Sequence, residues 1–105
     1  MEITPYDPAI FLKTDDDIAH YLNEAYEDAD PQVFIIALGD VAKIRGVAKV
    51  AKQANLNRES LYKVFSGKSQ PQWSTIQKVM KALDVHINLA CHVHAWVKLN
   101  HQIAY

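Results

Sequence analysis

The sequence of 105 residues contains one cysteine, three glycines and four prolines, and half of its residues are hydrophobic. With Cys91 alone, the chain cannot form an internal disulfide framework, and a cysteine-based zinc finger is excluded. No stretch approaches the roughly 18 consecutive apolar residues of a membrane span, and no basic and apolar leader precedes a cleavage site. We therefore expect one helical domain that stays in the cytoplasm without membrane contact.

Catalytic motifs are also missing. The sequence has no GxSxG, no P-loop, no HExxH and no convincing pair of nucleophile and base. Metal-ligand chemistry is confined to His86, Cys91, His92 and His94. On a strand the histidines share one face and Cys91 points to the other, which makes a single four-ligand site awkward. We expect no enzyme activity, no bound metal and no required cofactor; the alternative is a small metal-dependent regulator or enzyme that uses the histidine-rich strand.

Charge is distributed unevenly along the chain. Residues 1–40 contain ten acids and a single base, whereas residues 41–83 contain nine bases and a single acid. The net charge of −1 therefore conceals an acidic part and a basic part. A basic block favours binding to nucleic-acid phosphates through counterion release, and folding does not require it. The acidic part is either a solvated face or a surface for a basic protein partner.

Residues 47–66 have the apolar spacing of two short helices joined by a tight turn. The inward positions are Val50, Ala51, Ala54, Leu56, Leu61 and Val64. Asn55 stands where the chain must turn, a place that often needs a positive φ, which Asn tolerates better than most residues. Asn57 is placed to cap the second helix with its side-chain oxygen. This pattern is typical of a helix-turn-helix.

In a helix-turn-helix the second helix lies in the DNA major groove, with its first residues at the base edges. The predicted DNA-binding residues are the outward side chains of this helix and two residues of the following loop: Asn57, Arg58, Glu59, Ser60, Tyr62, Lys63, Lys68 and Ser69. Arg58 suits guanine, Glu59 a cytosine amino group, and Asn57 an adenine or a phosphate. The alternative is that these residues are the solvated face of a helical domain that never meets DNA.

Three further helices are predicted around the motif. The first covers residues 15–29, where Thr14 and Asp17 form a capping box and the apolar residues follow a helical spacing. The second covers residues 31–44, begins with the cap and proline Asp30-Pro31, and is dense in apolar residues. The third is an amphipathic helix over residues 73–83. Gly39 within the second helix suggests close helix packing.

The pattern changes to alternation in VHINLACHVHA, which begins at Val85. Alternation of apolar and polar residues predicts a half-buried strand. A lone strand has an unsatisfied edge, which pairs with the same strand of a second copy or with a partner's sheet. The predicted organisation is thus an extended lead-in over residues 1–14, a helical domain over 15–84, and a strand and tail over 85–105 as a possible dimerisation element.

Residues 4–89 resemble the addiction-module antidotes, the HigA-like antitoxins with a Cro/λ-repressor-type helix-turn-helix. The segments YLNEA, ALGDVAKIRG and LNRESLYK carry the likeness most specifically. The resemblance implies a homodimer that represses its own operon at operator DNA and neutralises a RelE/ParE-type toxin, usually a ribonuclease that blocks translation. It assigns recognition to Asn57, Arg58, Glu59, Tyr62 and Lys63, with Lys68 and Ser69 as backbone contacts.

The chain departs from the family pattern at two positions of the motif. Val47-Ala48 stands where the family commonly has Ser-Gln, and Asn55 replaces the usual turn glycine. The hypothesis is an all-α, five-helix Cro/λ-repressor-like helix-turn-helix domain with an added C-terminal β-strand, acting as a dimeric DNA-binding antitoxin. The alternatives are a stand-alone transcriptional repressor and a protein-interaction module in which the helix-turn-helix is purely structural.

Overall fold

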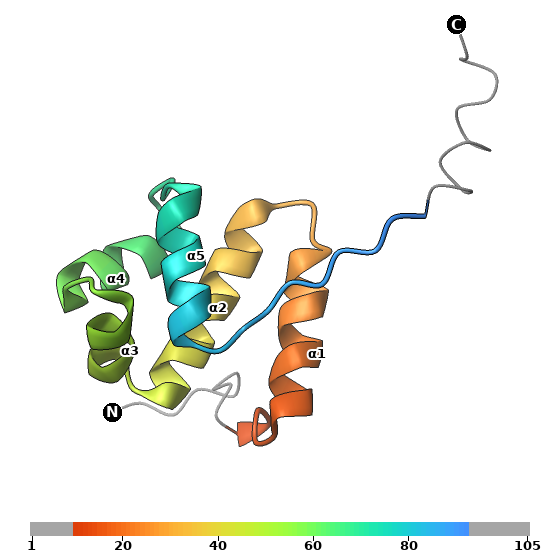
Figure 1. Ribbon diagram of the computed structural model, residues 1–105, viewed down its shortest axis with the longest axis horizontal. Coiled ribbons are helices and arrows are strands. Elements are labelled where there is room, and N and C mark those ends of the chain that lie inside the picture. The colour runs from red at the N-terminus through yellow and green to blue at the C-terminus, as the bar shows by residue number, and fades with distance from the viewer. Residues whose placement is uncertain (1–9, 93–105) are drawn as a thin grey trace, which may run out of the picture.

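The computed structural model describes residues 10–92, and Figure 1 shows the helices in these residues. They are α1 (Asp15–Tyr26), α2 (Pro31–Arg45), α3 (Val47–Ala54), α4 (Arg58–Phe65) and α5 (Trp73–Ala82). The prediction of five helices is confirmed. The largest error in a helix end is at α1, which ends at Tyr26 and not at residue 29. None of the described helices is long and apolar enough to cross a membrane.

The side chains predicted to cap the first two helices do so. The Thr14 hydroxyl accepts a hydrogen bond from the Asp17 backbone N–H at 3.0 Å, and the Asp17 carboxylate accepts one from the Thr14 N–H at 3.1 Å. At α2, the Asp30 carboxylate accepts from the Gln32 N–H at 2.9 Å. Each bond satisfies a backbone N–H at the start of the helix that has no partner within the helix itself. The starts of α1 and α2 are therefore fixed by local sequence.

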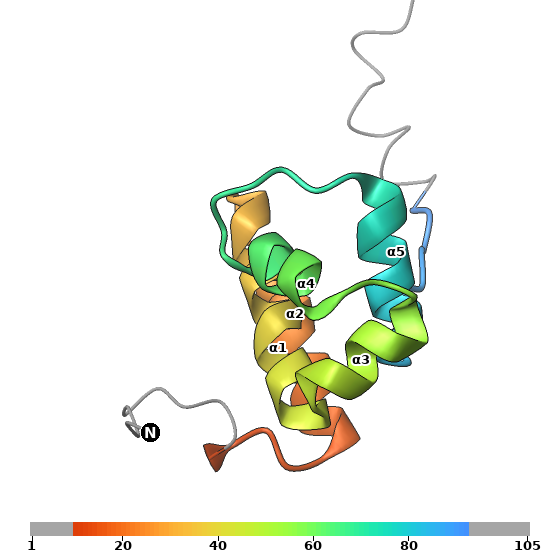
Figure 2. The same cartoon turned by 90° about the vertical axis from the view of Figure 1, so that its left-hand side faces the viewer.

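Helix α2 lies at the centre of the domain. It packs against α1 on one side and against α3 and α4 on the other, while α5 packs against α3 (Figures 1 and 2). Leu38 and Val41 of α2 are completely buried. A Cβ built on Gly39 would lie 2.8 Å from the Phe65 Cβ, so α2 and α4 approach too closely there for a larger residue. The prediction of close helix packing at Gly39 is confirmed.

The predicted C-terminal strand is wrong for residues 85–92, which follow α5 without strand structure. A strand requires a neighbour that accepts and donates its backbone hydrogen bonds, and residues 10–92 contain no other strand to supply one. The alternating pattern therefore does not bury one face: Leu89 is 89% exposed. Residues 1–9 and 93–105 lie outside the described part of the chain, including His94 and most of the predicted lead-in and tail.

Candidate nucleic-acid interface

The turn between α3 and α4 has the backbone conformation that the sequence predicts. Asn55 adopts φ 58° and ψ 43°, in the left-handed region. The Leu56 N–H donates to the Ala51 carbonyl at 2.9 Å, and the Asn55 N–H donates to the Lys52 carbonyl at 3.2 Å. These bonds satisfy carbonyls at the end of α3 that the helix leaves without partners. Asn is one of the few residues other than Gly that adopts this conformation at low cost.

The inward face of the helix pair is buried as predicted. The exposed fraction is at most 8% for the core positions of both helices, which are Val50, Ala51, Ala54, Leu61 and Val64. Leu56, in the turn, is partly buried and packs against the same core. Leu61 is fully buried, so α4 has its rotation about its own axis fixed by packing. The opposite side of α4 is consequently turned to solvent.

The predicted recognition residues lie on this outward side and at the start of α4. Asn57, Arg58, Glu59, Tyr62 and Lys63 are exposed, and Ser60 is half-buried. The Asn57 side-chain oxygen accepts from the Ser60 backbone N–H at 2.7 Å, which confirms the predicted cap. Because this oxygen is used by the cap, the two amide N–H groups are the donors that Asn57 would offer to DNA.

The loop after α4 separates the roles of Lys68 and Ser69. The hydroxyls of Ser66 and Ser69 donate to the Lys63 carbonyl at 2.8 and 3.1 Å, and the Lys68 N–H donates to the Ser66 hydroxyl at 3.2 Å. The Ser69 proton is therefore already used inside the loop. The Lys68 side chain is exposed, which makes it the better phosphate ligand of the two.

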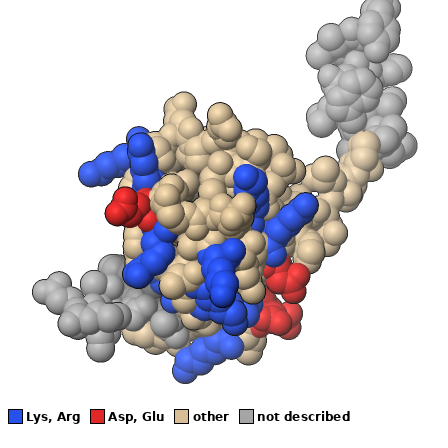
Figure 3. All heavy atoms as spheres, turned by 60° about the vertical axis from the view of Figure 1, so that its left-hand side comes forward, with Lys and Arg blue, Asp and Glu red and all other residues tan. Residues whose placement is uncertain are grey.

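Basic side chains dominate the surface around the helix pair. Figure 3 shows Lys and Arg spread over the face that carries α3 and α4, with few Asp and Glu. The exposed bases on these two helices and the loop that follows are Lys49, Lys52, Arg58, Lys63 and Lys68. Among the described residues, none of these five forms an ion pair with an acid. Their charge is therefore not neutralised within the domain, as binding to a polyanion requires.

Two features of this region were not among the predicted DNA-binding residues. Lys49 and Lys52 share the exposed face of α3, and their three-residue spacing on a helix was the signal that could have identified them. Trp73, at the start of the predicted amphipathic helix over residues 73–83, is 56% exposed. It is the first residue of α5, one turn before the buried Ile76. The apolar spacing of α5 therefore includes one residue that lies outside the core.

Residues 10–92 bring together no group of three His, Cys, Asp or Glu side chains that could hold a metal ion.

Over residues 2–91, the sequence matches the family described as "Probable addiction module antidote protein". It is also 35% identical over 88 residues to an uncharacterized protein of Haemophilus influenzae strain Rd, an alignment that covers 84% of this chain and 91% of that protein. No solved structure matches the chain.

Proposed function

The chain belongs to the family of probable addiction module antidote proteins, and on this premise we propose that it is the DNA-binding antitoxin of a type II toxin-antitoxin module. In this role it neutralises a RelE/ParE-type toxin and, as a homodimer, represses its own operon. We further propose that it is HigA-like and that α3 and α4 form a helix-turn-helix of the Cro/λ-repressor type. The family suggests a regulatory protein without enzyme activity.

The observation that carries the DNA-binding proposal is the start of α4. Burial of Leu61 fixes the helix, and Arg58 and Glu59 are exposed in its first turn. A recognition helix reads bases through such N-terminal residues. Arg58 can donate two hydrogen bonds to the O6 and N7 of guanine, while Glu59 can accept from the N4 amino group of cytosine. The surrounding lysines would supply the contacts to phosphates that do not depend on sequence.

Dimerisation follows from how much DNA one helix can read. A single recognition helix contacts only a few base pairs, so specific repression needs two copies on a two-fold symmetric operator. The half-sites of such an operator lie roughly one helical turn apart, at about 34–36 Å, or at multiples of this spacing. We therefore expect a palindromic operator upstream of the toxin and antitoxin genes.

The test combines partner binding with DNA binding. The full chain would be co-expressed with the product of the adjacent reading frame and purified by a tag on the chain alone. The purified material would then be titrated in a gel shift against the DNA upstream of both genes, with the same DNA carrying scrambled half-sites as the control. We expect a small toxin to co-purify and the complex to shift the native DNA at lower concentration than the scrambled DNA.

Each other outcome replaces the proposal with a specific alternative. A specific DNA shift without a co-purifying partner identifies a stand-alone repressor. A partner without a DNA shift identifies a protein-interaction module with a structural helix-turn-helix. Absence of both contradicts the antitoxin proposal in its DNA-binding part and in its toxin-binding part.

A further inference from the structure

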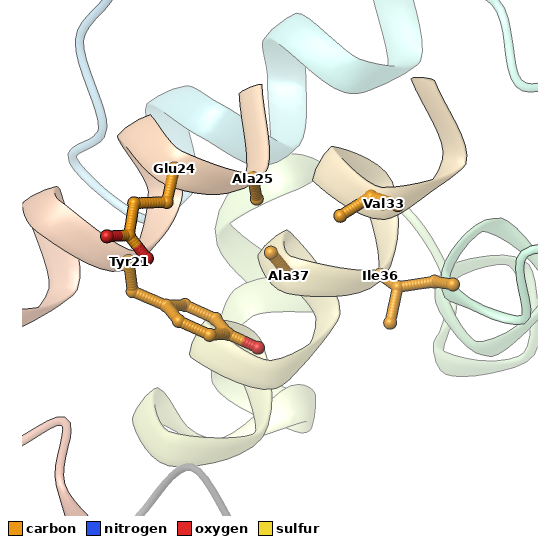
Figure 4. Close-up of a pocket in the computed structure, with 6 residues that line it drawn as sticks. All are labelled: Tyr21, Glu24, Ala25, Val33, Ile36 and Ala37. Carbon is orange, nitrogen blue, oxygen red and sulfur yellow. The ribbon is translucent and has the colours of Figure 1, made fainter. Parts of the chain in front are cut away.

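Helices α1 and α2 leave a shallow groove between them, with a volume of about 390 Å³ (Figure 4). Its lining comes from these two helices: Tyr21, Glu24, Ala25, Val33, Ile36 and Ala37. Ala25 and Ala37 lie in the floor, where they are 8% and 3% exposed. Because both alanine side chains end at a methyl group, α1 and α2 approach each other there, and the alanines leave the space above them unfilled. The groove is therefore a consequence of two small residues at one crossing.

The groove is apolar at its floor and along the α2 edge. Ile36 lies on that edge and is 44% exposed, so part of this side chain is open to an occupant of the groove. Val33 and Tyr21 are half-buried beside it. The Tyr21 hydroxyl donates to the Asp40 carboxylate at 2.6 Å and so holds the ring in place. A partner that covers this surface would gain hydrophobic free energy in proportion to the apolar area buried.

The other edge of the groove is acidic. Glu24 lines it, and Asp17 is two helical turns earlier, on the same side of α1. Asp40, which does not line the groove itself, accepts the hydrogen bond of the Tyr21 hydroxyl that does. Residues 14–42, which include both helices' contributions to the groove, contain eight acids and no Lys or Arg. An occupant must therefore combine apolar side chains with positive charge at its flank.

We propose that this groove, which we call the α1–α2 groove, is the docking site for the toxin. The occupant is a toxin segment that places apolar side chains over Ala25 and Ala37 and Lys or Arg side chains beside Glu24 and Asp17. The inference rests on the proposed antitoxin function and adds the surface through which it acts. Charge complementarity favours such a segment, because a Lys or Arg side chain beside Glu24 in the groove lining would be attracted to its carboxylate.

A second copy of this chain fits the groove poorly. Two such grooves facing each other would bring their acidic edges together, which costs free energy. The basic face of α3 and α4 would satisfy the charge, but such a contact would cover the proposed DNA-binding surface. The groove is lined by α1 and α2, whereas that surface lies on α3 and α4, so one chain can hold toxin and operator together.

The test uses the full chain, the toxin encoded by the adjacent reading frame, and titration calorimetry. Ala25→Leu fills the groove without changing charge, and its control is Ala19→Leu on the exposed side of the same helix. Glu24→Lys reverses the acidic edge, and its control is Glu27→Lys, the same charge change at a residue that does not line the groove. Operator binding by gel shift and thermal unfolding report whether each variant is folded.

We expect Ala25→Leu and Glu24→Lys each to weaken toxin binding by about tenfold or more, with operator binding unchanged. The two controls should change it by less than about threefold. Equal toxin affinity for the groove variants and wild type would overturn the assignment of the groove as the toxin-docking site, while leaving the antitoxin function intact. Equal losses of affinity in the groove variants and their controls would overturn it in the same way. Failure of the wild-type chain to bind the toxin would overturn both proposals.

Discussion

Helices α1 and α4 are built in the same way but present opposite charge to solvent. Each begins with a side-chain cap, at Thr14 and Asn57 respectively, and each buries one face in the common core. The outward side of α1 is acidic, whereas α4 exposes two bases and one acid, and the exposed bases of α3 and the following loop surround it. Since core packing uses the inward residues, the outward residues that do not cap a helix are available for binding.

The acidic and basic parts of the domain hardly neutralise each other. Within residues 10–92, one ion pair joins them, between the Arg45 guanidinium and the Asp15 carboxylate at 3.2 Å. Both side chains are solvent-accessible, and such surface pairs contribute little to stability. The separation of charge therefore has no evident role in holding the helices together. It suits a molecule with two partners of opposite charge, as we propose for the toxin and the operator.

The largest expected effect comes from the inward side of α4. Leu61→Ala should lower the free energy of unfolding by about 2–5 kcal/mol, because it removes a fully buried side chain and leaves a cavity. Lys63→Ala, an exposed neighbour in the same helix, should change it by less than about 0.5 kcal/mol. Urea unfolding followed by circular dichroism measures both. Similar losses in the two variants would show that the two sides of α4 are not distinct.

The outward side of α4 should affect binding without affecting stability. Arg58→Ala should weaken operator binding by about 1–3 kcal/mol and relax specificity at one base position, since it removes a proposed base contact. Lys78→Ala removes the same charge from the exposed side of α5. Any loss of DNA binding that it causes should be the same for all DNA sequences. Gel-shift titrations on the operator and on single-base variants measure the difference. Unchanged affinity in Arg58→Ala would refute the assignment of this residue.

Removing a contact between α1 and α2 should have a smaller effect on stability, and this effect should depend on pH. Tyr21→Phe removes the hydrogen bond to Asp40 and should cost about 1 kcal/mol. Burial, together with this bond, raises the pKa of Tyr21 from 10.0 to about 12. A raised pKa contributes stability that is complete below the unfolded value and is lost as the pH rises from about 10 to 12.

Denaturant unfolding at several pH values tests this contribution. The difference in stability between wild type and Tyr21→Phe should shrink as the pH rises from about 10 to 12. Tyr26→Phe changes a tyrosine on the same helix that is 54% exposed, and should leave the wild-type pH dependence in place. A constant difference across this range would contradict the role of the Tyr21 hydroxyl.

The smallest effect is expected at the capping box of α1. Hydrogen bonds from the backbone N–H groups of Lys13 and Thr14 lower the pKa of Asp17 below 3.8. A lowered pKa contributes stability that is present above the unfolded value and is lost as the pH falls through the folded value. Asp17→Asn should therefore lack part of the acid destabilisation seen below about pH 4, whereas Asp16→Asn should keep it. Thermal unfolding from pH 2 to 6 compares them, and identical acid profiles would contradict the capping contribution.

Much of the domain could be predicted from sequence because its signals are local. The caps at Thr14, Asp30 and Asn57 and the turn at Asn55 each depend on residues within a few positions of one another. The inward positions of α3 and α4 follow from helical spacing, and the remaining positions form the outward side. The placement of the candidate recognition residues was therefore predictable, although the DNA sequence that they would read was not.

Other features depend on how the helices pack, and sequence spacing does not determine them. The alternation after residue 85 predicts a strand, but a strand exists only where a neighbouring strand bonds to its backbone, and residues 10–92 supply none.

By itself, the sequence determined the five helices, the side-chain caps of α1, α2 and α4, and the charge that each helix presents, because these arise from residues close together in the chain. Tertiary structure decided that Trp73 lies outside the core and that Ala25 and Ala37 lie together in the floor of a groove. The physical reason is that burial and cavities are set by the crossing of whole helices, which brings distant residues together at distances that no local spacing specifies.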